Sequence, residues 1–257
     1  MPFPVDVTAL LDSFMAGIQN SLPHNLVGVY LRGSLAMGDF IPGTSDLDVL
    51  AVTERPVNDT EFAALLAMHA QITALPNPYA NRLEMVYIDQ SAFRRFQPGL
   101  RHPTLGQGEK LAWREHHENW ILERWVVRQY GIALLGPEAH TLVDPVVPEE
   151  IRNAVRLRLA DWVDWANSPD DPDWKLPRSH KAYTVETMCR ALYTLATGEL
   201  ASKTASVAWA LQTLPEPWRT TVERSQAWRT DPTYDPTIAF EVSQFILWTA
   251  ASSSKAE

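Results

Sequence analysis

Cysteine is almost absent from this chain of 257 residues, in which Cys189 is the single example. A disulfide framework and a cysteine-based metal site are therefore not expected. Long hydrophobic runs are also missing, because no stretch approaches the roughly eighteen apolar residues that a membrane-spanning helix needs. The N-terminal segment has no basic region, and Asp6 and Asp12 interrupt its apolar pattern, so we expect an amphipathic helix and no signal peptide. These absences predict a folded cytoplasmic protein.

Positively charged residues are also fewer than negatively charged ones. Lys and Arg total 22 against 31 Asp and Glu, which gives a formal net charge of −9. A general nucleic-acid binder is normally basic, so we expect neither a nucleic acid nor a membrane as partner. An acidic protein can still bind a nucleotide through a few local cations, and its field attracts a polycationic small molecule.

Hydrophobic periodicity divides the chain into two parts. In the first ninety residues, helical spacing over 6–20 and 58–75 alternates with β-rich runs over 25–33, 46–53 and 82–89. The later segments with helical spacing are 110–135, 149–166, 181–197, 203–213, 216–229 and 236–252. Breaks rich in proline or marked by glycine separate them. We therefore predict an α+β protein, with a mixed sheet and flanking helices over residues 1–105 and an all-helical bundle over residues 106–257.

One short stretch, LRGSLAMGDFIPGTSDLDVLAV over residues 31–52, does not fit an ordinary core. Asp46 and Asp48 lie two residues apart in a strand, so their carboxylates share one face, roughly 7 Å apart along the strand. Like charges this close favour a cation between them, and Mg²⁺ prefers one or two carboxylates together with phosphate oxygens. Glu84 lies in the middle of the third predicted strand and joins the same acidic group if the two strands are neighbours.

Gly33 and Ser34 precede this acidic pair at the end of another strand. A glycine allows close approach of a backbone to a ligand, and backbone N–H groups with a serine hydroxyl make a cradle for an anion. A phosphate cradle beside metal-binding carboxylates predicts metal-assisted displacement at phosphorus. The alternative is structural, in which Asp46 caps a turn and Asp48 forms a salt bridge on an edge strand.

The motif GSLAMGDFIPGTSDLD resembles the signature of the DNA polymerase β-like nucleotidyltransferase superfamily. Residues 188–215 and 126–137 are similar to segments of the aminoglycoside 3''-adenylyltransferases, so the resemblance covers nearly the whole chain. It implies an N-terminal nucleotidyltransferase domain and a C-terminal helical domain. It also implies Mg²⁺-dependent transfer of AMP from ATP to a hydroxyl of an aminoglycoside or aminocyclitol antibiotic such as spectinomycin or streptomycin.

The resemblance also implies a role for each matching residue. Asp46, Asp48 and Glu84 would form the metal-binding and catalytic carboxylates, with Glu84 as general base for the acceptor hydroxyl. The residues implied to bind the nucleotide are Gly33, Ser34, Ser45, Arg190, Lys203 and Trp228. Of these, Arg190 and Lys203 would contact the triphosphate, and Trp228 would contact the nucleoside.

The acceptor is less well defined by the sequence. Trp113 and the acids near it could line an acceptor pocket, although residues 112–120 also suit a solvated helix face and lack the HExxH zinc spacing. The streptomycin-modifying relatives have an acidic residue where this chain has His180. This departure puts streptomycin in doubt and leaves the acceptor open.

Two other functions remain open at this point. The first is the same chemistry on another acceptor, either a different small molecule or a protein side chain. The second is a nucleotide-binding relative without catalytic activity. The sequence determines neither the nucleotide base preference nor the oligomeric state, for which a monomer is our expectation.

Overall fold

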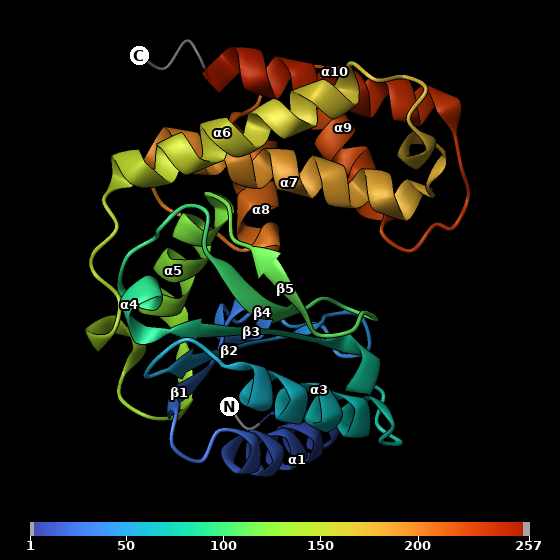
Figure 1. Cartoon of the computed structure of the whole chain (residues 1–257). Helices are drawn as coiled ribbons and strands as arrows, with labels where there is room; N and C mark the ends of the chain where they lie inside the picture. The colour runs from blue at the N-terminus through green and yellow to red at the C-terminus, as the bar shows by residue number, and fades with distance from the viewer. Residues whose placement is uncertain (1–2, 254–257) are drawn as a thin grey trace. The chain divides into compact units, whose positions relative to one another are not determined.

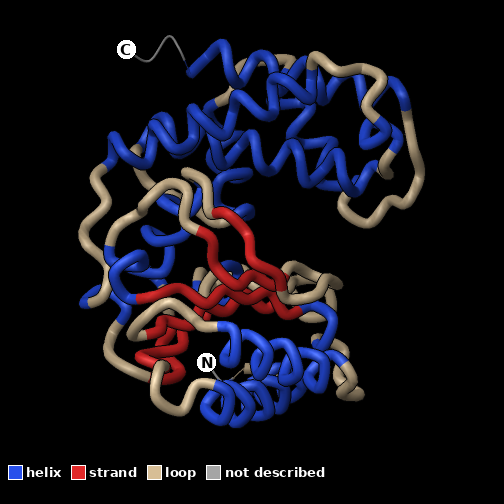
Figure 2. The backbone as a smooth tube through the Cα atoms, in the orientation of Figure 1, coloured by secondary structure: helices blue, strands red, loops and turns tan. Residues whose placement is uncertain are grey.

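The structure, a computed structural model, describes residues 3–253. These residues belong to two compact units, Met1–Pro145 and Val146–Glu257. Figure 1 labels the elements of both units, and Figure 2 shows that the described strands all lie in the first unit, whereas the second is built from helices.

The first unit is built around a six-stranded sheet with the order β5-β4-β3-β2-β1-β6. The strands are β1 (Leu26–Leu31), β2 (Leu47–Thr53), β3 (Leu83–Asp89), β4 (Arg101–Leu105), β5 (Ala112–Glu115) and β6 (Ile132–Leu135). The helices are α1 (Val5–Ser21), α2 (Gly33–Ala36), α3 (Asp59–Thr73), α4 (Gln90–Arg94) and α5 (Asn119–Tyr130), with short 3₁₀ turns η1 (Ala80–Arg82) and η2 (Ala139–Thr141).

Strands β2 and β3 form the parallel pair of the sheet, whereas the other neighbouring strands are antiparallel. A parallel pair needs a crossover connection, and α3 supplies it. The start of α3 is fixed by a capping box: the Asn58 side chain accepts from the Glu61 N–H, and the Glu61 carboxylate accepts from the Asn58 N–H. Because the two strands run in the same direction, the carboxylates near the start of β2 and β3 lie at the same end of the sheet.

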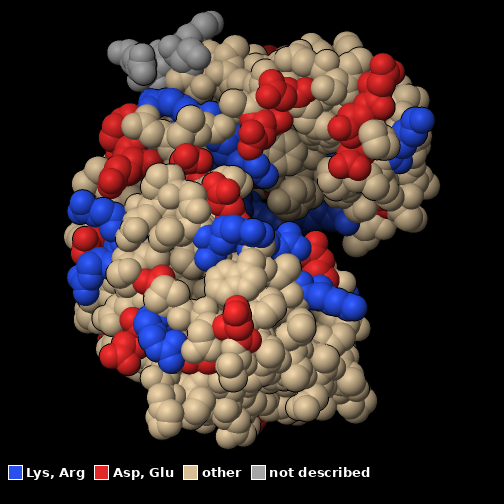
Figure 3. Space-filling model, in the orientation of Figure 1, with Lys and Arg blue, Asp and Glu red and all other residues tan. Residues whose placement is uncertain are grey.

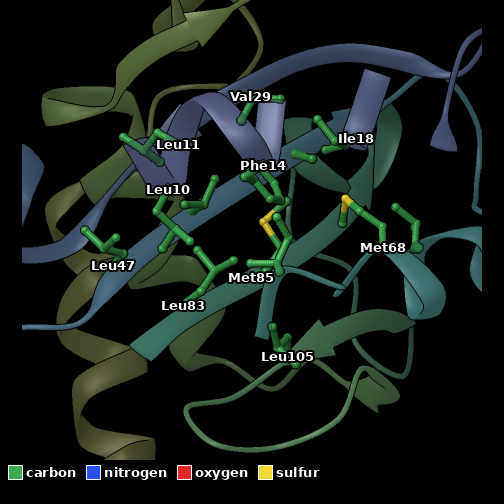
Figure 4. Packing of buried hydrophobic residues seen from close by; sticks show 14 of the residues in the cluster. Leu10, Leu11, Phe14, Ile18, Val29, Leu47, Met68, Leu83, Met85 and Leu105 are labelled. Carbon is green, nitrogen blue, oxygen red and sulfur yellow. The ribbon is translucent and has the colours of Figure 1, made fainter. Parts of the chain in front are cut away.

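Both faces of the sheet are covered. Alternate residues of β2, Val49 and Ala51, pack with α1 and α3, and Figure 4 shows Phe14, Met68 and Met85 in this cluster. The intervening Leu50 and Val52 pack on the other face, against side chains of α4 and α5. A strand that is buried on both faces has a near-continuous run of apolar residues. The sequence shows such a run over residues 46–53, where a mostly buried strand is predicted.

The second unit is an all-helical bundle around α7 (Arg178–Thr197), which packs against its neighbouring helices in the unit. The other helices are α6 (Pro148–Ala166), α8 (Lys203–Thr213), α9 (Trp218–Ser225) and α10 (Pro236–Ser253), with 3₁₀ turns η3 (Pro172–Lys175) and η4 (Gln226–Trp228). Gly198 ends α7 in the left-handed conformation, with φ of 75°. The predicted helical bundle is confirmed.

The structure corrects the sequence prediction between residues 90 and 145. The predicted helix over 110–135 is instead strand β5, helix α5 and strand β6. Periodicity failed here because each of these edge strands has only four residues, too few for the alternation of a strand to be told from a helical pattern. The division between units falls at Pro145 and Val146, within a proline-rich break, whereas the sequence places a boundary after residue 105. The difference arises because β5 and β6 complete the two ends of the sheet.

Among the described residues, no helix is both long enough and apolar enough to cross a membrane. On the face that Figure 3 shows, the Lys and Arg side chains of the described residues are interspersed with Asp and Glu in each unit.

Candidate active site

Two strands bring the predicted carboxylates together. In the parallel ladder Asp48 of β2 is the direct partner of Glu84 of β3. Asp46 lies just before β2, and it is close enough to Glu84 to affect the electrostatic potential there. All three side chains are only partly exposed. The strand adjacency on which the predicted acidic group depends is therefore confirmed.

Glu84 is the carboxyl that this arrangement perturbs most. Burial, followed by repulsion from Asp48, raises its pKa to about 7, with smaller contributions from Asp46 and Glu123 in the same direction. Arg32 opposes the shift. A carboxyl with a pKa near neutrality can exchange a proton at physiological pH, which is the property required of a general base.

Gly33 lies directly against this group. Its φ of 61° is in the left-handed region, and a Cβ atom built on it would overlap the carboxylate of Asp48. Glycine is thus needed both for its backbone conformation and for the closeness of the two segments. Ser34 follows in the short helix α2.

Ser45 has a local partner in its own loop. Its hydroxyl accepts a hydrogen bond from the N–H of Ile41 at 2.9 Å, and its N–H donates to the Ile41 carbonyl at 2.9 Å. This pair of bonds shapes the loop that leads into β2. Ser45 therefore supports the position of the Asp46–Asp48 segment.

Arg32 is a site residue that sequence reasoning missed. Its guanidinium is 2.7 Å from Glu123 Oε2 and 3.4 Å from Asp48 Oδ1, and the residue is 8% exposed. Burial alone would lower its pKa, but Glu123, Asp48 and Glu84 outweigh this and raise it, so it stays charged. One signal was available: Arg32 is the lone charged residue in the apolar run over residues 26–36.

A group of stacked aromatic rings forms a second set of unpredicted neighbours of the site. Trp120 lies under the guanidinium of Arg32, 5.6 Å from ring centroid to Cζ, and stacks on His116 at 3.7 Å. His116 in turn is 4.5 Å from His102. Burial lowers the pKa of His102 to about 4 and that of His116 to about 2, so both rings are neutral at pH 7. No motif in the sequence indicates this column of rings.

Trp113, predicted to contact the acceptor, lies on β5 and is partly exposed. Its ring stacks on Phe62 of α3, with centroids 5.5 Å apart. The region around it is an edge strand and not the solvated helix face that the sequence also allowed.

The remaining predicted residues lie in the second unit. Arg190 has a buried Nε without a hydrogen-bond partner, and neither it nor Lys203 forms an ion pair among the described residues. The ammonium of Lys203 lies 4.7 Å from the ring centroid of Tyr183. Two cations without carboxylate partners in their own unit are available to an anionic ligand.

His180 and Trp228 are more enclosed. His180 lies edge-on to Trp165, and burial, followed by the nearby Lys181, lowers its pKa, so it is a neutral residue at pH 7. Trp228 is 5% exposed, and Arg224 lies over its ring at 5.5 Å. These surroundings are those of a packed tryptophan more than of an open stacking surface.

The described residues contain no group of three His, Cys, Asp or Glu arranged to hold a metal ion. The three-carboxylate metal set of Asp46, Asp48 and Glu84 stays a prediction from the sequence. Asp48 shares its carboxylate with Arg32.

Known protein families match both halves of the chain. Residues 18–91 match the nucleotidyltransferase domain, and residues 141–241 match the C-terminal domain of aminoglycoside adenylyltransferases. The second match begins close to the division between the two units at Pro145.

Individual relatives extend over most of the chain. An aminoglycoside (3'')(9) adenylyltransferase of Rhizobium radiobacter is 32% identical over 222 residues, covering 82% of this chain and 78% of the relative. One from Shigella flexneri is 27% identical over 235 residues, covering 87% and 86%. A spectinomycin 9-adenylyltransferase of Campylobacter jejuni is 24% identical over 204 residues, covering 76% and 74%.

A solved structure shares the fold. It is a spectinomycin adenyltransferase from Enterococcus faecialis with ATP and spectinomycin, and it matches with a TM-score of 0.74 at 16% identity. The match covers 96% of this chain and 99% of that one. The predicted α+β fold with a C-terminal helical region is confirmed.

Proposed function

The chain belongs to the aminoglycoside adenylyltransferase family, and from that premise we propose that it transfers AMP from ATP to a hydroxyl of an aminoglycoside or aminocyclitol antibiotic. The observation that carries the proposal is the pairing of Asp48 with Glu84 across β2 and β3, with Gly33 against the Asp48 carboxylate. A structural salt bridge on an edge strand does not explain it, because β2 lies inside the sheet.

Glu84 is the proposed general base. It takes the proton of the acceptor hydroxyl, whose oxygen attacks the α-phosphorus of ATP in line. The bond to the bridging oxygen of the β-phosphate breaks, and pyrophosphate leaves. A pKa of about 7 keeps a large fraction of Glu84 ionised at neutral pH while leaving it basic enough to accept the proton.

Asp46 and Asp48 are the proposed ligands of Mg²⁺. Asp46 and Asp48 supply carboxylate oxygens, which are the ligands that a hard cation such as Mg²⁺ prefers. When bound, the ion would neutralise charge on the phosphates and so favour displacement at phosphorus. Asp46 and Asp48 would hold the nucleotide through that ion, and Glu84, which the sequence also predicts as a ligand, is proposed chiefly as the base.

Gly33 and Ser34 are proposed to hold the phosphates, with Ser45 shaping the adjoining loop. Arg190 and Lys203 are proposed to contact the triphosphate, and their lack of ion-pair partners in their own unit supports this. Trp228 stays a prediction as the nucleoside contact. Most of the rate acceleration would come from positioning and from stabilising charge.

Spectinomycin is the acceptor we propose first, with Trp113 and His180 among the residues that contact it. A neutral His180 does not supply a negative charge to a cationic drug, which argues against streptomycin. Because ATP is the co-substrate, we expect the enzyme to act in the cytoplasm. A monomer without nucleic-acid or membrane partners stays the prediction from the sequence.

An acceptor panel with isotopically labelled ATP tests the proposal. Mass spectrometry should find one added AMP on spectinomycin, with release of pyrophosphate, and no product with Glu84→Gln. AMP on streptomycin alone would correct the acceptor, and AMP on a protein side chain would replace the antibiotic as substrate. Nucleotide binding without pyrophosphate release for any acceptor would leave a non-catalytic relative.

A further inference from the structure

Arg32 occupies an unusual position for a cation next to a metal-binding motif. It is buried, it directly precedes Gly33, and its guanidinium is shared between two carboxylates. The closer of the two is Glu123 on α5 at 2.7 Å, and the other is Asp48 at 3.4 Å. The Arg32 side chain therefore links Asp48, the proposed metal ligand, to helix α5, which is distant from it in sequence.

Helix α5 is itself held firmly. The guanidinium of Arg124 is 2% exposed and donates to the backbone carbonyls of Ala92, Phe93 and Trp120. Trp120 packs in the core of this face of the sheet and also lies 5.6 Å from the Arg32 guanidinium. Glu123 is one residue away from Arg124, so its carboxylate is presented to Arg32 from a fixed backbone.

We infer that Glu123 is a positioning residue that acts through Arg32, keeping the guanidinium from competing with a divalent cation for Asp48. The inference rests on the proposed function, since it assumes that Asp48 binds a metal. Without Glu123, Arg32 has only Asp48 as a close carboxylate partner, and it would pair with Asp48 more tightly. The metal would then have to displace a buried cation.

The direct test is binding of Mn²⁺, as a substitute for Mg²⁺, measured by electron paramagnetic resonance without ATP or acceptor. Glu123→Gln should weaken Mn²⁺ binding about tenfold, and the Mg²⁺ concentration for half-maximal transfer should rise in parallel. Glu54→Gln is the matched control, because Glu54 is exposed in the same unit and directly follows the other end of β2. That control should bind Mn²⁺ like the wild type.

A double-mutant cycle separates action through Arg32 from the simple loss of a negative charge. Arg32→Met should tighten Mn²⁺ binding, and in that background Glu123→Gln should have no further effect. An equal weakening in both backgrounds would overturn the inference, as would unchanged binding in Glu123→Gln alone. If Arg32→Met does not fold, Glu123→Asp decides: it keeps the charge but moves the carboxylate away from Arg32. Weaker binding supports the inference, and wild-type binding contradicts it.

Failure of the proposed function would look different. Because Mn²⁺ binding is measured without the nucleotide, the cycle gives the same answer whether or not an antibiotic is modified. Absence of Mn²⁺ binding in the wild-type protein, both alone and with a non-hydrolysable ATP analogue, would remove both the metal ligands and the role of Glu123. Normal Mn²⁺ behaviour with no adenylylated product would remove only the acceptor.

Discussion

Asp48 and Glu84 are direct partners in the parallel ladder between β2 and β3. This pairing places two carboxyl groups side by side at a sheet position where burial and mutual repulsion raise the pKa of one of them, Glu84, to about 7. Two neighbouring acids can divide the work, with Asp48 proposed to bind a cation and Glu84 to move a proton. The two predictions about Glu84 that follow depend on that division.

Replacing the proposed base should abolish transfer and spare the fold. Glu84→Gln keeps the size of the side chain but cannot accept the proton, so turnover should fall by a factor of about 10²–10⁴. ATP affinity by calorimetry should stay within about twofold. The variant should also melt at a higher temperature at pH 8, because it removes a buried charge whose raised pKa costs stability above neutrality. Turnover near the wild-type rate would remove Glu84 as the base.

Activity should depend on pH through the same group. Only the ionised form of Glu84 accepts a proton, so kcat/KM should fall tenfold per pH unit as the pH drops below about 7, and level off above it. The measurement is a pH–rate profile at a fixed Mg²⁺ concentration well below saturation, because a bound cation beside Glu84 would itself lower the pKa. A profile that stays flat down to pH 5 would show that the reacting base is a carboxyl with an ordinary pKa.

The buried histidines should make the first unit sensitive to acid. Burial lowers the pKa of His102 to about 4 and of His116 to about 2, whereas in the unfolded chain both titrate near 6.5. The unfolded state therefore binds more protons between these values, and stability is lost as the pH falls below 6.5. At pH 5.5 the loss should be on the order of 1 kcal/mol for each histidine.

Urea unfolding of His116→Phe at pH 7.5 and pH 5.5 measures this effect. The phenyl ring keeps the stacking on Trp120 but cannot be protonated, so the difference between the two pH values should shrink relative to wild type. His24→Phe is the control, because His24 is exposed. The same loss of stability in all three proteins would assign the acid sensitivity to other groups.

Part of the candidate site can be predicted from the sequence alone. Asp46, Asp48 and Glu84 were found from spacing, because strand periodicity puts residues two apart on one face and a buried carboxylate is costly without a purpose. The β2–β3 pairing confirmed the neighbourhood of Asp48 and Glu84. Local patterns were sufficient here because the two strands are consecutive and joined by a single helix.

Arg32, Glu123 and Trp120 were not found, and the reason is physical. Their contact joins residues ninety-one apart in sequence, and no local pattern reports a pairing across that separation. The short edge strands β5 and β6 were missed for a related cause. Strand β6 is stabilised by hydrogen bonds to β1, which is distant in sequence. Strand β5 pairs with the preceding strand β4, but it has only four residues, too few to show a clear periodicity.

Gly33 should be intolerant of any side chain for two separable reasons. Alanine there must adopt φ of 61°, and its Cβ would also overlap the carboxylate of Asp48. Gly38 has a similar φ of 75° but nothing within 4 Å of a built Cβ, so Gly38→Ala isolates the backbone cost. Gly38→Ala should lose about 1 kcal/mol of stability, and Gly33→Ala should lose more and should also lose Mn²⁺ binding and transfer activity. Equal activity in the two variants would separate Gly33 from the site.

Arg190 offers a test in which function and stability should change in opposite directions. Its Nε is buried without a hydrogen-bond partner, and it forms no ion pair among the described residues, so the folded protein gains little from its charge. Arg190→Met keeps the aliphatic stem and should match or exceed the wild-type melting temperature. Its affinity for ATP should nevertheless fall about tenfold or more, because a charge-assisted contact to phosphate is lost. Arg158→Met, which removes an exposed ion pair with Asp161, should leave ATP affinity unchanged. A destabilised Arg190→Met with normal ATP binding would assign Arg190 to packing in α7 and remove it from the triphosphate.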